Sequence, residues 1–166
     1  MLLAVDMGNT NIEFGLLDND RIILSERVST DTSKTAAEYA VVLHNIFEIR
    51  KVKVEDIEGA IISSVVPPLT NAIKEAIKTI TGKTPLIVAP GVKTGLKINV
   101  EDAKAVGADL IVGCVAGVAQ HGFPLIVIDL GTASTIVVVD REGNVVARFE
   151  PTEDMKKVAE CVASLI

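Results

Sequence analysis

The feature that most constrains the fold is a short pattern that occurs twice in the chain. Residues 3–10 read LAVDMGNT and residues 127–132 read VIDLGT. Both copies place an aspartate and then a glycine at the end of an apolar run. Both continue into an apolar segment, an acidic turn (18–20 and 140–143) and another apolar segment. One Asp-x-Gly arises easily by chance, but two in the same strand context predict two units of similar construction.

The order of the predicted elements indicates one fold class. Periodicity and turn residues predict three strands, a helix, a strand, a helix, a strand and a last long helix. Their expected ranges are 2–5, 12–17, 22–28, about 31–50, 59–63, 67–80, 85–88 and about 100–121. This is the ribonuclease-H-like (actin-like) order, an α/β fold whose mixed sheet has helices on both faces. We expect a first such domain over residues 1–122 and an incomplete second one over residues 123–166.

Composition excludes several function classes. The 166 residues are 49% hydrophobic, which predicts a sizeable core, but only 3% are aromatic and none is tryptophan. That scarcity and the net charge of −6 argue against nucleic-acid binding. No apolar run approaches the roughly 20 residues that span a bilayer, so we expect no membrane contact. Cys114 and Cys161 lie in apolar helical patterns without metal-ligand spacing, which favours buried thiols and a cytoplasmic location.

The two repeated turns have the residue types of a phosphate site. In residues 6–11 and 129–134 a glycine lets the backbone approach a ligand closely, and hydroxyl or amide side chains add donors. A carboxylate at the strand end, here Asp6, suits a hydrated Mg²⁺ ion. The alternative is that each turn is an ordinary hairpin that uses glycine and asparagine for their backbone freedom. The occurrence of two such turns favours a shared polyphosphate ligand.

Asp109 is the third candidate, because it stands among apolar residues in the segment VGADLIV, residues 106–112. A carboxylate in such surroundings needs a partner or a task, since an unpaired buried charge is costly. A general base with a raised pKa is one such task. The alternative is a polar position on an amphipathic helix.

Together these segments resemble the type III pantothenate kinase family. The resemblance follows the family's order over roughly residues 1–145, and the strings SSVVPP and PGVKTGL are its most specific parts. The matching segments are residues 6–11, Thr30 with Lys34-Thr35 and Glu38-Tyr39, residues 63–68, 90–96, 107–109 and 129–135. The resemblance implies transfer of phosphate from ATP to pantothenate, the first step of coenzyme A biosynthesis. It also implies Mg²⁺ with ATP, a monovalent cation (K⁺ or NH₄⁺) and a homodimer.

The resemblance also implies a role for each site residue. ATP would be bound by Asp6, Met7, Gly8, Asn9, Thr10, Asn11, Ile12, Glu13 and Thr132. Pantothenate would be bound by Gly107, Ala108, Asp109 and Leu110, with Asp109 as the catalytic base. Asp129 would bind the monovalent cation, and Asp6 would hold Mg²⁺ through water.

The chain departs from the family pattern in three places. Leu110 stands where the family commonly has arginine, and Val100 stands where it commonly has an aromatic residue. After Val146 the family continues with a glycine-rich strand and about a hundred further residues, whereas residues 147–166 here predict a strand end and one helix. A catalytic kinase and a truncated or non-catalytic relative that only binds a nucleotide or a partner therefore both remain open. Another actin-like sugar or acid kinase fits the specific strings less well.

Overall fold

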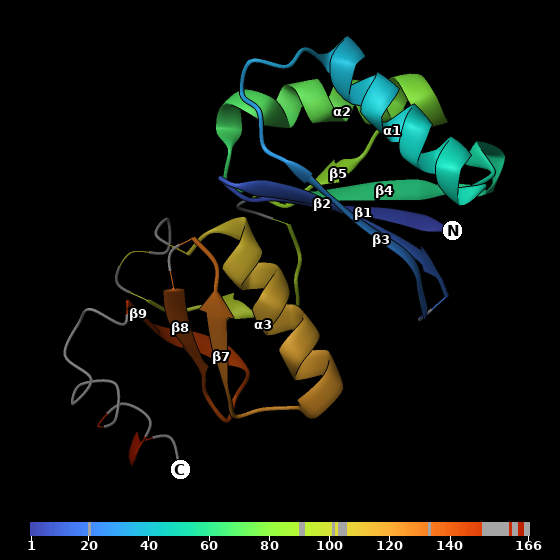
Figure 1. Cartoon of the computed structure of the whole chain (residues 1–166). Coiled ribbons are helices and arrows are strands. Elements are labelled where there is room, and N and C mark those ends of the chain that lie inside the picture. Colours follow the sequence, from blue (N-terminus) through green and yellow to red (C-terminus); the bar gives the residue numbers. More distant parts are fainter. Residues whose placement is uncertain are drawn as a thin grey trace. The chain divides into compact units, whose positions relative to one another are not determined.

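The computed structural model describes residues 1–19, 21–89, 92–100, 102, 106–132, 134–150, 160 and 163–164. The chain forms two compact units, Met1–Pro90 and Gly91–Ile166, and each has a sheet of its own (Figure 1). The division falls earlier than the expected limit after residue 122. The reason is that the long third helix packs on the second sheet rather than on the first.

The first unit contains a five-stranded sheet in the order β3-β2-β1-β4-β5. The antiparallel strands β1, β2 and β3 meander, and β1, β4 and β5 run parallel. This mixed order confirms the predicted ribonuclease-H-like fold class. The strands are β1 (Leu2–Met7), β2 (Asn11–Asp18), β3 (Arg21–Ser29), β4 (Gly59–Ser64) and β5 (Leu86–Ile87).

Two fifteen-residue helices and one 3₁₀ turn, η1 (Val54–Asp56), complete this unit. Helix α1 (Ala36–Arg50) begins at a capping box in which Thr35 and Glu38 each satisfy the other's backbone N–H group. Helix α2 (Pro67–Thr81) begins with two prolines, whose fixed φ suits a first turn, and ends at Gly82 with a φ of 68°. Local sequence therefore sets most of these helix boundaries.

Helices α1 and α2 lie side by side on one face of the first sheet (Figure 1), rather than on both faces as expected. Alternate strand residues on that face are fully buried against them. The largest side chains of this core are Tyr39, Phe14, Phe47, Leu3, Met7 and Ile12. The opposite face, which we call the open face, carries the apolar side chains of Leu2, Ile61 and Leu86, each more than a third exposed.

The second unit contains a four-stranded sheet in the order β6-β9-β8-β7, and a helix packs on it. Its elements are β6 (Lys97–Ile98), α3 (Ala108–His121), β7 (Leu125–Leu130), β8 (Ser134–Val139) and β9 (Asn144–Phe149). Helix α3 was expected from about Val100, but it begins at Ala108 because Gly107 is still extended (φ −64°, ψ 163°). The helix predicted after Pro151, and Cys161 with it, lie outside the described residues.

Two glycines allow α3 to lie close to β7. A Cβ atom at Gly113 would be 3.6 Å from Val127, and one at Gly117 would be 3.1 Å from Leu125. Because these glycines are four residues apart and their partners two apart, they mark one contact line along helix and strand. No helix among the described residues is long and apolar enough to cross a bilayer.

Candidate phosphate-binding turns and base

The first candidate turn connects β1 to β2 and is closed by backbone contacts. The Gly8 N–H group donates a 2.9 Å hydrogen bond to the Asn11 carbonyl oxygen. A Cβ atom at Gly8 would lie only 3.3 Å from that oxygen, so this position suits glycine. Asn9 and Thr10 are exposed at the tip of the turn.

Thr30, which follows β3, fixes this turn from the neighbouring strand. Its hydroxyl donates a 2.6 Å hydrogen bond to the Gly8 carbonyl, and its N–H group donates a 2.9 Å bond to the Thr10 carbonyl. Two anchors from one residue hold the turn at both ends. The backbone that would receive a phosphate is therefore held by two hydrogen bonds that need no ligand.

Asp6 lies at the end of β1 on the open face, and its side chain is exposed. Its cross-strand neighbour Glu13 forms an ion pair with Arg27 of β3. Asp6 and Glu13 therefore lie side by side on the open face at the start of the turn, and the Arg27 guanidinium offsets the charge of Glu13. The described residues contain no cluster of three or more His, Cys, Asp or Glu side chains that could hold a metal ion. A divalent ion at Asp6 would thus depend on water and nucleotide oxygens, as Mg²⁺ commonly does.

The helix that follows β4 contributes little to anion binding. Pro67 and Pro68 occupy the first turn of α2 and have no N–H groups. The Val66 N–H group is already bonded to the Ser64 hydroxyl at 3.1 Å. Donors for a phosphate at this edge of the sheet therefore come from the β1–β2 turn rather than from the α2 N-terminus.

The second candidate turn connects β7 to β8 and repeats the first arrangement. Asp129 is half-buried and lies opposite Thr135, as Asp6 lies opposite Glu13. Thr132 is exposed in the turn, and Ser134 closes the hairpin opposite Leu130. The predicted repeat is thus present as two antiparallel hairpins, each with an aspartate just before its turn.

Asp109 lies in the first turn of α3, where it is half-buried rather than enclosed. One carboxylate oxygen accepts a 2.8 Å hydrogen bond from the Leu110 N–H group, and a negative charge is favourable in the first turn of a helix. Asp109 is four residues before Gly113, and Asp129 is two residues after Val127. The N-terminal end of α3 lies beside the C-terminal end of β7 (Figure 1). The contact line of the two glycines therefore places Asp109 and Asp129 at the same end of this helix–strand pair.

Comparison with known proteins identifies the family to which these features belong. Residues 2–147 match the family described as type III pantothenate kinase, a span that includes both turns and Asp109. The chain belongs to the type III pantothenate kinase family. Its membership explains why the two hairpins and the α3 start occur together.

Curated relatives named type III pantothenate kinase are similar over most of the chain. The protein from Geotalea uraniireducens is 46% identical over 143 residues, which are 86% of this chain and 56% of that protein. The protein from an Exiguobacterium species is 44% identical over 142 residues, with the same two shares. The chain therefore spans about half the length of the curated relatives it matches.

A solved structure supports the fold. A crystal structure from Porphyromonas gingivalis, described as an N-acetylglucosamine kinase, superposes with a TM-score of 0.52 at 14% identity. The alignment covers 92% of this chain and 49% of that one. At this identity the likeness concerns the fold alone.

Leu110 departs from the family pattern for a reason that the structure makes clear. Its side chain is 5% exposed and packs in the second core with Val106, Cys114, Val137 and Val139. A substrate contact at this position would have to use the backbone. Val100 also packs against this core, as a partly buried residue. Both departures thus place aliphatic side chains in the second core.

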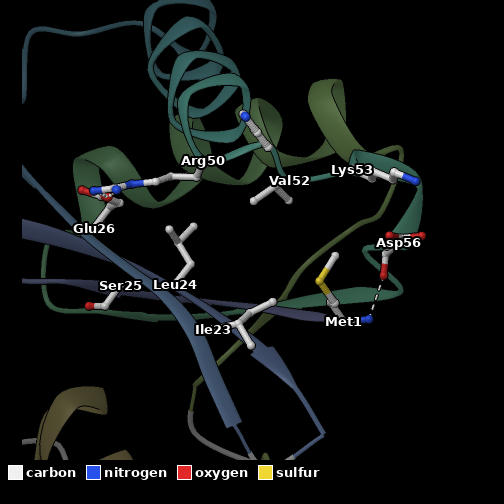
Figure 2. Close-up of a pocket in the computed structure, with 10 residues that line it drawn as sticks. Met1, Ile23, Leu24, Ser25, Glu26, Arg50, Val52, Lys53 and Asp56 are labelled. Carbon is white, nitrogen blue, oxygen red and sulfur yellow. Dashed lines mark hydrogen bonds and ion pairs between the residues drawn. The ribbon is translucent and has the colours of Figure 1, made fainter.

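A pocket of about 590 Å³ lies away from all these residues, at the start of β1 (Figure 2). Its lining includes Met1, Leu24 and Val52, and none of the predicted site residues. Arg50 pairs with Glu26, and the Met1 ammonium group donates a 2.7 Å hydrogen bond to the Asp56 carbonyl. These basic groups are already paired or complement the C-terminal end of α1, so we do not include the pocket in the candidate site.

The sequence analysis included Thr30 in a matching segment but did not predict that this residue anchors the β1–β2 turn. The signal was weak, because a threonine after a strand is common and only the β2–β3 pairing brings it to Gly8. Ser63 is more conspicuous in the sequence than Thr30, because it is a polar residue near the end of the apolar strand β4.

Proposed function

We propose that this chain provides the ATP-binding turns and the catalytic base of a pantothenate kinase. The reaction transfers the γ-phosphoryl group of ATP to the hydroxyl group of pantothenate and yields 4'-phosphopantothenate and ADP. The observation that supports this most is the family match over residues 2–147, which includes both Asp-x-Gly hairpins and Asp109. Phosphoryl transfer needs mainly positioning and charge neutralisation, which such turns are suited to supply.

In this proposal the β1–β2 turn holds the ATP phosphates. The segment from Asp6 to Glu13 supplies backbone and side-chain donors, and Thr132 in the second turn adds a hydroxyl. Mg²⁺ bound with the nucleotide neutralises phosphate charge, and the exposed carboxylate of Asp6 fits its hydration shell. Thr30 keeps the turn in a fixed geometry, so less ordering is needed when the nucleotide binds.

Asp109 acts as the base for the pantothenate hydroxyl. As the new O–P bond forms and the bond to the ADP oxygen breaks, the hydroxyl proton passes to the free carboxylate oxygen of Asp109. The other oxygen holds the Leu110 N–H group, which fixes the carboxylate in orientation. Gly107 and Ala108 would approach the substrate through their backbone. Asp129, at the same end of α3 and β7, would hold the monovalent cation.

We also propose a cytoplasmic homodimer whose interface is the face of α3 that does not pack on its own sheet. The helix packs on its sheet through Leu110, Cys114 and the two glycines. Val112, Val115 and Ala119 lie outside that buried set and carry no charge. An apolar face beyond the sheet contact favours burial against another copy. A monomeric mass in sedimentation equilibrium at high micromolar concentration would contradict this part.

A second candidate function is nucleotide binding without phosphoryl transfer. The buried Leu110 favours it, because the arginine that the family commonly has there would pair with an anionic substrate. Loss of that donor weakens pantothenate capture but leaves the ATP turns unchanged. The two candidates therefore differ in turnover and agree in Mg²⁺-ATP binding.

The experiment measures formation of 4'-phosphopantothenate by two proteins. One is the 166-residue chain, and the other is a chimera in which the C-terminal part of the Geotalea uraniireducens relative follows Val146. We expect little or no turnover by the chain and clear turnover by the chimera. Asp109→Asn keeps the bond to the Leu110 N–H group, so it should lower turnover by about 10²–10⁴-fold with ATP binding little changed.

Two results would decide against catalysis by these residues. A chimera whose turnover is unaffected by Asp109→Asn would exclude Asp109 as the base. A chimera that binds Mg²⁺-ATP but forms no product would favour the binding function. Robust turnover by the 166-residue chain alone, abolished by Asp109→Asn, would confirm the base and show that the chain needs no further domain.

A further inference from the structure

Ser63 in β4 has a buried hydroxyl group that lacks a hydrogen-bond partner among the described residues. The residue is only 5% exposed, so water does not readily replace the missing bond. An unsatisfied hydroxyl of this kind costs about 1–3 kcal/mol. Such a group in a functional region suggests that a partner arrives in another state of the protein.

The register of the sheet identifies that partner. Ser63 and Asp6 are Cα partners in the parallel strands β4 and β1, so their side chains leave the sheet on the same face. The residues next to Asp6 on that face of β1 are Ala4 and Gly8, which have no polar side chain. On the other side, continuation of the β4–β5 register places the apolar Val88 beside Ser63.

Asp6 is therefore the acidic side chain beside an unused donor. A carboxylate is an acceptor with two oxygens, and a serine hydroxyl has one proton to donate. Carboxylates that hold metal ions are usually oriented by hydrogen bonds from neighbouring groups. The neighbouring Ser64 is not available for this task, because its hydroxyl already contacts Thr70 at 2.9 Å and accepts from Val66.

We propose that Ser63 is a positioning residue for Asp6. When Mg²⁺-nucleotide binds, the Ser63 hydroxyl donates a hydrogen bond to one carboxylate oxygen of Asp6, and the other oxygen faces the hydrated ion. This inference rests on the proposed function of Asp6. It gives β4 a part in nucleotide binding that neither turn contains, and it gives a role to a buried hydroxyl that has no partner among the described residues.

The test is calorimetric titration of the 166-residue chain with ATP. The titration is made once in the presence of Mg²⁺ and once in the presence of EDTA, which removes the metal ion. Ser63→Ala should weaken Mg²⁺-ATP binding by about 10-fold, the lower end of the effect seen for residues that orient metal ligands. Binding of ATP in EDTA should be unchanged. Ser63→Thr, which retains the hydroxyl, should restore affinity. Ser25→Ala, an exposed serine on the same sheet face, is the matched control.

Two further measurements separate positioning from a structural role. In an Asp6→Ala background, Ser63→Ala should cause no additional loss of Mg²⁺-ATP affinity. The melting temperature of the Ser63→Ala protein without nucleotide should not fall, because the removed hydroxyl makes no hydrogen bond to any part of the chain that the structure describes. An unchanged Mg²⁺-ATP affinity in Ser63→Ala, or an equal loss in both backgrounds, would overturn the inference.

The outcomes also separate this inference from the proposed function. If the chain binds Mg²⁺-ATP, and Asp6→Ala weakens that binding while Ser63→Ala does not change it, only the role of Ser63 fails. If the unmodified chain binds no Mg²⁺-ATP, the nucleotide function and the role of Ser63 fail together.

Discussion

The Thr30 hydroxyl donates a 2.6 Å hydrogen bond to the carbonyl oxygen of Gly8, across the strand that separates them. This contact joins the end of β3 to the turn proposed to hold ATP. In the proposed function the backbone of this turn binds ATP, and the Thr30 side chain that anchors it would touch no ligand. The role of Thr30 can therefore be tested separately from that of the turn itself.

Thr30→Val should destabilise the β1–β2 turn and lower the affinity for nucleotide. The substitution keeps the shape and the backbone bond to Thr10 but leaves the Gly8 carbonyl without its side-chain donor. We expect the free energy of unfolding of the first unit to fall by about 1 kcal/mol. Mg²⁺-ATP affinity should fall several-fold in calorimetry. Thr32→Val, at an exposed position in the same loop, is the control and should change neither quantity.

The two α3 glycines should respond differently to alanine. In a helix interior this change gains up to about 1 kcal/mol from backbone propensity. At Gly113 the new Cβ meets Val127 at 3.6 Å, an ordinary contact, whereas at Gly117 it meets Leu125 at 3.1 Å. Urea unfolding followed by circular dichroism should therefore rank Gly113→Ala above Gly117→Ala in stability. The reverse order would show that α3 and β7 are not packed along this line.

Leu110→Arg should destabilise the second unit rather than restore a family feature. Leu110 is 5% exposed among aliphatic residues, and a buried, unpaired guanidinium costs several kcal/mol. We expect urea unfolding to show a loss of about 3 kcal/mol or more. Leu110→Met preserves volume and should cost less than about 1.5 kcal/mol. A stable Leu110→Arg protein with improved pantothenate binding would place this side chain at the substrate instead.

The stability of the second unit should depend on alkaline pH through Cys114. Burial raises the pKa of this thiol from 9.0 to about 11. The unfolded chain then releases the proton first, so the stabilisation is complete below pH 9 and is lost as the pH rises towards 11. The slope is about 1.4 kcal/mol per pH unit at most. Urea unfolding between pH 8 and 10.5 should show this loss, and Cys114→Ala should reduce it. Equal slopes in both proteins would contradict the assignment.

The sequence was sufficient for features that depend on neighbouring residues. Thr35 and Glu38 cap α1, prolines begin α2, and each Asp-x-Gly ends a strand in a hairpin. These signals are local, so they can be read without the tertiary structure. The fold class followed from their order.

Features that depend on distant contacts were not predictable in the same way. The burial of Leu110 depends on β8 and β9, and the start of α3 depends on the extended Gly107. The isolation of the Ser63 hydroxyl depends on the register between β4 and β1. The role of Asp109 as a base, and that of Asp129 in cation binding, stay predictions.

Tyr39, a fully buried residue of α1 in the first unit, is the only tyrosine in a chain without tryptophan. Tyrosine fluorescence of this protein therefore comes from one core alone. A melting curve followed by that fluorescence records the loss of the first core, and the second unit could open unobserved. The Cys114 thiol, fully buried on the other side of the division, offers the complementary probe, since a thiol reagent would detect it only when that unit opens.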